Sequence, residues 1–229
     1  MSSNFTSTFG GGGAPKRITT LTSGTGTFTP LSDNARCDVI IQGGGSSGAR
    51  VNAGTSAPGG AAGATTFLSM LAPIAGVPYQ VGSGGASVTS GIASGNAGTR
   101  SKFAGVVAEG GGAPSTSTGG IGGQVGEYAT SNDGLGCPIS VCGGGGANPG
   151  SANTSNAAGF RPNSTSARGG VTNSASGNGS GGNSVLALGG QAQADTVAGV
   201  AGTRGSGGSG ASGAPSGAGG DGVIIIVEY

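Results

Sequence analysis

Short runs of glycine interrupt the sequence along nearly its whole length, as at Gly10–Gly13, Gly43–Gly45, Gly110–Gly112 and Gly143–Gly146. Glycine supplies 57 of the 229 residues, and each glycine in a helix interior costs roughly 1 kcal/mol relative to alanine. We therefore expect almost no α-helix. The runs do not keep the three-residue repeat of collagen, and only 10 residues are proline, so a collagen triple helix is excluded as well.

An ordered chain of this composition must be held together mainly by its backbone, because only 4% of the residues are aromatic. Extended helices with three residues per turn have no internal hydrogen bonds, so their N–H and C=O groups can bond to neighbouring helices. We expect a bundle of such polyglycine-II-like helices, with glycine facing inward and Ser, Thr, Asn and Ala facing outward. Disorder is the alternative, but the formal net charge of +1 lacks the charge excess typical of disordered chains.

The last apolar run of the chain, Val223 to Val227, contains five consecutive β-formers. Its counterpart is the run Cys37 to Ile41, and we predict that the two pair at the centre of a small sheet. The fold class is therefore mainly β and irregular, with a sheet base closed by the C-terminal strand and a glycine bundle projecting from it. Strands are expected within residues 17–42, 64–81, 101–109 and 222–229.

Residues 17–229 are interpreted as a single glycine-rich domain, preceded by a flexible leader at residues 1–16. The leader lacks the charged and apolar regions of a signal peptide. Phe5 and Phe9 lie four residues apart in it. They are candidates for attachment to a partner, or they cover the start of the domain.

The titratable residues do not indicate a catalytic, metal or cofactor site. The chain has no histidine and eight carboxylates that form no recognisable pair, so we expect no enzymatic activity, no metal and no cofactor. The basic residues are scattered, which argues against nucleic acid as a partner. Cys37, Cys137 and Cys142 are expected to be buried thiols or to form one incidental bridge, and Asp195 and Asp221 to be turn or solubilising residues.

Binding is expected from the loops that are poorer in glycine, at residues 126–142 and 153–168. Aromatic and arginine side chains are frequent contact anchors. The alternative is that the two aromatic residues of these loops fill the domain's own interior. The receptor-contact candidates are Tyr128, Phe160, Arg161 and Arg168.

Several motifs, taken in order, resemble the glycine-rich domain at the distal end of bacteriophage tail fibres and related receptor-binding adhesins. The resemblance runs from about residue 18 to the end of the chain. Ala104 stands where the family usually has glycine. The motifs are Gly24-Thr-Gly-Thr-Phe-Thr-Pro30, Cys37-Asp-Val-Ile-Ile-Gln-Gly-Gly-Gly45, Gly76-Val-Pro-Tyr-Gln-Val-Gly-Ser-Gly-Gly85, Ser101-Lys-Phe-Ala-Gly105 and the closing segment Gly219 to Tyr229.

This resemblance implies layers of polyglycine helices whose connecting loops contact a host receptor, either a glycan or an outer-membrane protein. It implies a non-enzymatic virion protein, made in the host cytoplasm and assembled as a homotrimer. A short chain with its own Met1 is expected to be a tip or accessory subunit, docked to another virion protein through residues 1–16. The alternative is a structural decoration or head-fibre protein, and a more distant one is a non-viral ice-binding bundle.

Overall fold

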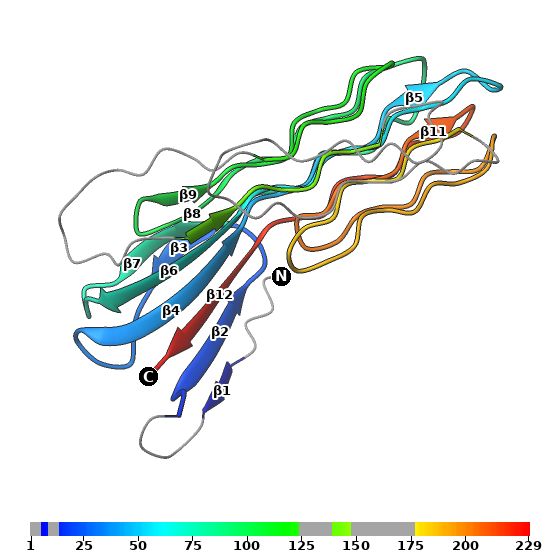
Figure 1. Cartoon of the computed structure of the whole chain (residues 1–229). Helices are drawn as coiled ribbons and strands as arrows, with labels where there is room; N and C mark the ends of the chain where they lie inside the picture. The colour runs from blue at the N-terminus through cyan, green and yellow to red at the C-terminus, as the bar shows by residue number, and fades with distance from the viewer. Residues whose placement is uncertain (1–5, 9–13, 124–138, 148–176) are drawn as a thin grey trace.

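The C-terminal apolar run forms the central strand of the main sheet. In the computed structural model, which describes residues 6–8, 14–123, 139–147 and 177–229, β12 (Val223–Glu228) lies between β2 (Arg17–Leu21) and β4 (Ala35–Gln42). Val223 is opposite Gln42, and Glu228 is opposite Cys37. The predicted pairing of the two apolar runs is therefore confirmed (Figure 1).

The main sheet is antiparallel and has the strand order β1-β2-β12-β4-β6-β10. Beyond β4 lie β6 (Thr65–Ala72) and β10 (Ile139–Val141). The opposite edge is β1 (Thr6–Thr8), which pairs with β2. Residues 6–8, which the sequence assigned to a flexible leader, are thus hydrogen-bonded to the sheet.

A second, four-stranded antiparallel sheet covers one face of the main sheet. It consists of β3 (Thr25–Phe28), β7 (Val77–Gln80), β8 (Ser101–Phe103) and β9 (Val106–Ala108). Alternate residues of β4 and β12 point into the space between the two sheets and are buried. They pack with Phe28 and Phe103, whose ring centroids lie 5.9 Å apart. The apolar core is therefore confined to this end of the molecule.

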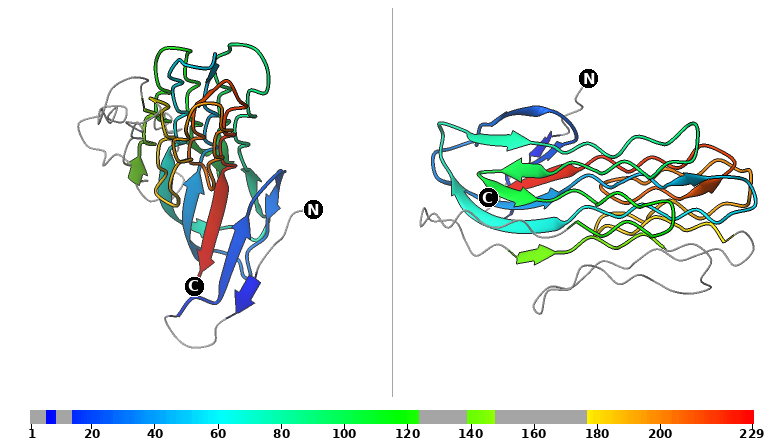
Figure 2. Two further views of the ribbon diagram at one scale, coloured as in Figure 1. Left: turned by 90° about the vertical axis from the view of Figure 1, so that its right-hand side faces the viewer. Right: turned by 90° about the horizontal axis from the view of Figure 1, so that it is seen from above.

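Glycine-rich segments run out from the sheets and back again, forming a long bundle (Figure 1, and from above in Figure 2). Its only paired strands are the short parallel β5 (Arg50–Val51) and β11 (Ala211–Ser212), within the described residues. No helix occurs in the described part of the chain. The fold is therefore mainly β and irregular, as the sequence predicts, and the sheets are not closed into a barrel.

Segment 43–49, which continues from β4, lies at the centre of the bundle and is buried throughout. Its backbone N–H groups donate in strict rotation to three neighbouring segments. Gly43, Ser46 and Ala49 donate to residues of segment 57–64 at 2.8–3.0 Å, and the two residues between each of them donate to two other segments. Since a three-residue turn presents successive groups about 120° apart, this pattern is that of a polyglycine II helix.

Carbonyl groups of the same segment accept hydrogen bonds from three further segments. Six neighbours therefore surround it, which leaves no room for side chains larger than those of Gly, Ser and Ala. A Cβ atom on Gly45 would lie 2.0 Å from the carbonyl oxygen of Ser206. The six neighbours are segments 57–64, 93–100 and 214–222, to which it donates, and 81–88, 109–115 and 206–212, from which it accepts.

The expectation that Ser and Ala face outward is wrong for this interior. Ser46, Ser47 and Ala61 are all buried to 0% exposure. The Ser46 hydroxyl accepts a hydrogen bond from the Ala61 N–H at 2.7 Å, and Ser47 Oγ accepts one from the Asn96 N–H at 2.8 Å. Because each hydroxyl replaces a carbonyl as acceptor, serine enters the bundle without leaving a polar group unpaired.

Candidate functional site

The six residues that the sequence singled out lie outside the described residues. They are Tyr128, Phe160, Arg161 and Arg168, the receptor-contact candidates, and Phe5 and Phe9, the attachment candidates. The candidate site among the described residues is therefore built from other side chains. It is the free end of the bundle, where the described segments turn back toward the sheets.

We call this end the bundle tip and define it as loops 52–56, 89–92, 194–197 and 213–215. The bundle tip is the end of the bundle farthest from the main sheet. Figure 2 (left) views the molecule from this end. The loops come from distant parts of the sequence, and Gly54 and Asp195, which are hydrogen-bonded to each other, are 141 residues apart. The bundle brings the loops together because β5 and β11, which lead into two of them, are paired in parallel.

The Arg50 side chain connects two of the loops, 89–92 and 213–215. Its Nε–H donates to the Ala214 carbonyl at 3.1 Å, and its Nη1–H donates to the Gly91 carbonyl. The Arg50 backbone also exchanges two hydrogen bonds with Ala93, both at 3.0 Å. A guanidinium that satisfies carbonyl groups of two neighbouring loops fixes their relative position, because its donors form a rigid planar fork.

Asp195 joins the other two loops. Its carboxylate accepts a hydrogen bond from the Gly54 N–H at 2.9 Å and another from the Ser212 hydroxyl. These bonds favour the charged form, so the pKa of Asp195 is lowered, first by the Ser212 hydroxyl and then by the Gly54 N–H. Asp195, which the sequence predicts to be a turn or solubilising residue, therefore also connects distant loops.

Thr196 is held in an unfavourable backbone conformation at the bundle tip. Its φ is +62°, a left-handed value that is uncommon for a β-branched residue and costs about 1–2 kcal/mol. The Thr196 N–H donates to the Ser212 carbonyl at 2.8 Å. Strain of this kind persists where the surroundings enforce it, and it is enriched at functional sites.

The accessible side chains of the bundle tip include hydroxylic and aliphatic groups beside the exposed Asp195 carboxylate. Thr55, Thr89 and Ser90 are exposed, and Ile92 and Val197 are 58% and 45% exposed. Such a surface can form hydrogen bonds and apolar contacts with a ligand, and braced loops lose little freedom when they do so.

No group of three or more His, Cys, Asp and Glu side chains that could hold a metal ion occurs in the described part of the chain. Cys37 and Cys142 are both buried, and Cys37 has a free thiol. Burial raises the pKa of the Cys37 thiol to about 12, with a smaller contribution from the Glu228 carboxylate. The Cys37 thiol is therefore protonated at neutral pH and is a poor nucleophile and metal ligand.

Sequence reasoning missed Arg50, Asp195 and Ser212 because their partners lie 17 to 164 residues away, with no local motif to connect them. Arg50 was counted among the scattered basic residues. One feature distinguishes Arg50 from the other basic residues in the sequence. It directly follows segment 43–49, so that a charged residue ends a run of small ones.

Comparison with known proteins gives one result on family membership. A family model described as a glycine-rich domain matches residues 19–229. No curated protein matches the chain. None of the described residues forms a helix long and apolar enough to cross a membrane.

Proposed function

We propose that this chain, which belongs to the glycine-rich domain family through residues 19–229, is a non-enzymatic bacteriophage virion protein. In this proposal it is a receptor-binding adhesin of a tail fibre or tail tip, and it contacts the host cell surface. The motif resemblance described above supports the phage assignment.

The braced bundle tip is the observation that carries this proposal. Arg50 and Asp195 connect its four loops through hydrogen bonds to Gly91, Ala214, Gly54 and Ser212. An adhesin gains affinity when its contact loops are already ordered, since less conformational entropy is lost on binding. The receptor is a glycan or an outer-membrane protein, to which exposed hydroxyl groups and aliphatic side chains can both bind.

In this proposal the sheet end of the molecule, opposite the bundle tip, serves for assembly into the virion. β1 places part of the N-terminal leader at the edge of the main sheet, and we assign attachment to another tail or fibre protein to the leader. We also propose a homotrimer, the usual state of fibre proteins. Sedimentation equilibrium of the purified chain distinguishes a trimer from a monomer.

Cell binding by purified, fluorescently labelled protein tests the role of the bundle tip. Replacing Ile92 with Asp is expected to reduce binding to susceptible cells by about tenfold, a change of about 1.4 kcal/mol in binding free energy. Leu71→Asp is the matched control, because Leu71 is 59% exposed, against 58% for Ile92, but lies at the far end of β6. Equal loss in both variants, or no loss in Ile92→Asp, contradicts the assignment of the tip.

Immunogold labelling of intact particles tests the location. Gold at the tail or at fibre tips supports the adhesin. Gold on the head contradicts it and favours the alternative, a structural decoration or head-fibre protein.

A further inference from the structure

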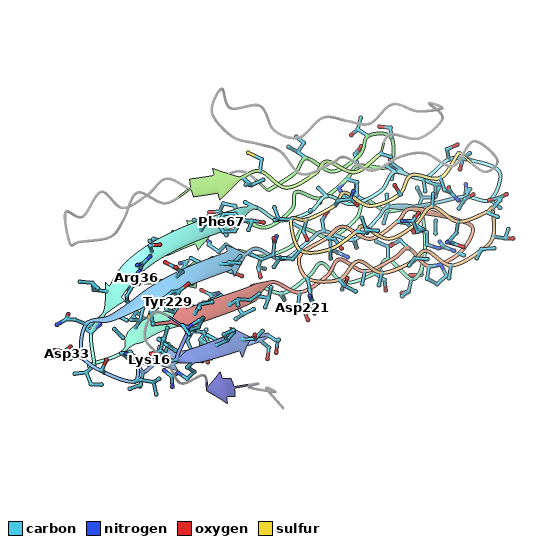
Figure 3. All side chains as sticks on the ribbon, turned by 60° about the horizontal axis from the view of Figure 1, so that its bottom comes forward. Lys16, Asp33, Arg36, Phe67, Asp221 and Tyr229 are labelled. Carbon is cyan, nitrogen blue, oxygen red and sulfur yellow. The ribbon has the colours of Figure 1, made fainter. Side chains whose placement is uncertain are left out.

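A groove lies where the main sheet meets the bundle, at the opposite end of the bundle from its tip. It has a volume of about 480 Å³, within the range of small-ligand sites. Figure 3 shows Asp221 at this junction, next to the start of β12. The side chains that matter for recognition are those of Thr20, Thr22, Thr203, Arg204, Asp221 and Ile225.

The backbone at Arg204 is fixed. Arg204 lies in a tight turn in which the Ser206 N–H donates to the Thr203 carbonyl at 3.0 Å. The Arg204 carbonyl accepts a hydrogen bond from the Ser184 hydroxyl at 2.9 Å. The Arg204 side chain is exposed and forms no hydrogen bond or ion pair within the described residues. A guanidinium on a rigid support therefore lines the groove with its donors unused.

Folding does not explain an arginine at this position. Arg204 has a φ of +45°, a conformation that strongly favours glycine. Eight glycines of the described chain adopt a positive φ, including the next residue, Gly205, with a φ of +76°, and the other non-glycine residues that do so are Asn34, Ala104 and Thr196. Since glycine would relieve the strain, the backbone of this turn does not require an arginine.

The groups around Arg204 complement a hydroxylated ligand. The hydroxyls of Thr20 and Thr22 have no hydrogen-bond partner within the described residues. Asp221 accepts the Gly84 N–H through Oδ1 at 2.7 Å, which leaves Oδ2 available as an acceptor. Ile225, half-buried on β12, provides an apolar floor.

From this arrangement we propose that the groove binds a carboxylated sugar residue. The Arg204 guanidinium receives the carboxylate, because the two groups match in planar geometry and charge. The threonine hydroxyls and Asp221 hydrogen-bond the ring hydroxyls, and the C–H face of the ring packs on Ile225. Asp221 places a negative charge in the same groove, so a ligand with several anionic groups is disfavoured and the single carboxylate is directed to Arg204.

Titration of the ¹⁵N-labelled full-length chain with sodium D-galacturonate tests this site, with the Arg204 Nε–H and the Gly202, Gly220 and Gly222 amides as reporters. These resonances are expected to shift and saturate. Arg204→Gly is expected to weaken the affinity by at least about tenfold while keeping or raising the melting temperature, because glycine accepts the φ of this turn. D-galactose and inorganic phosphate, titrated in the same way, are expected to shift the reporters far less.

Arg36→Ala is the matched control. It removes a guanidinium from the same face of the main sheet but outside the groove, where Arg36 packs over the Tyr229 ring at 5.3 Å. It is expected to bind D-galacturonate like the unaltered chain. The proposal is overturned if the groove reporters do not move, if Arg204→Gly binds equally well, or if galactose or phosphate binds as tightly as galacturonate. None of these results depends on the role of the bundle tip in cell binding.

Discussion

The two halves of this molecule are ordered by different chemical groups. Between the sheets, side chains such as Ile224, Ile226, Val39 and Phe103 are buried against one another and exclude water. In the bundle, the central segment 43–49 has no large side chain, and its N–H and C=O groups bond to the six segments around it.

The difference changes what each half tolerates. A sheet core is defined by the volume of its side chains, so removing atoms leaves a cavity and weakens it. The bundle is defined by the contact distance between backbones, so adding atoms separates the segments and breaks their hydrogen bonds. A substitution to a larger residue should therefore lower stability most in the bundle. A substitution to a smaller residue should lower stability most in the sheet core.

The largest effect is expected in the bundle from adding one methyl group. Gly45→Ala would place a Cβ 2.0 Å from the Ser206 carbonyl oxygen, and because all six neighbours are bonded to this segment, none can move alone. We expect a loss of more than about 4 kcal/mol in unfolding free energy, measured by chemical denaturation. Gly112→Ala is the control, since its nearest contact would be at 3.0 Å. A Gly45→Ala protein as stable as the control would show that the bundle is loosely packed.

A smaller effect is expected in the sheets from removing atoms. Ile226 is fully buried in the core, whereas its neighbour Ile225 points to the other face and is half-buried. Ile226→Ala should lower the unfolding free energy by about 3 kcal/mol through the cavity it leaves, and Ile225→Ala by about 1 kcal/mol. Denaturation of the two variants in parallel measures the difference. Equal losses would mean that both faces of β12 are covered in solution.

The smallest effect is expected at the bundle tip and depends on pH. Because the folded pKa of Asp195 is lowered, its contribution to stability is present above the ordinary aspartate pKa of about 3.9 and is lost as the pH falls through the folded value. In an NMR titration, the Gly54 and Thr196 amides should report this lowered pKa. Asp195→Asn should abolish the transition, while Asp33→Asn, at the sheet end, should leave it in place. A Gly54 transition that survives in Asp195→Asn would assign the titration to another group.

The sheet half could be predicted from the sequence because its signals lie in side chains. The run from Val223 to Val227 needs burial, and the run from Cys37 to Ile41 matches it in length and supplies apolar residues to pair with it. The division into two sheets was not predicted. Strands as short as β8 and β9 do not encode their partners, and their placement depends on Phe103 entering the core next to Phe28.

The bundle half could be predicted only as a type of structure. Glycine content indicates polyglycine helices, but Gly43, Gly44 and Gly48 have no side chain that specifies which segment each one bonds to. The bundle tip was not predicted for the same reason. Its braces, Arg50 and Asp195, acquire their partners only after the backbone of the bundle has set the positions of the loops.

The rotation of hydrogen bonds along segment 43–49 sets a rule for changes in chain length. Inserting one residue before Ser46 would turn the remaining N–H groups by a third of a turn, so that each would face the wrong neighbour. Inserting three residues would return each N–H group to the neighbouring segment it now faces, one turn further along. Bundle segments can therefore lengthen or shorten only in triplets, whereas the tip loops can change by any number, so changes of other lengths are expected only at the bundle tip.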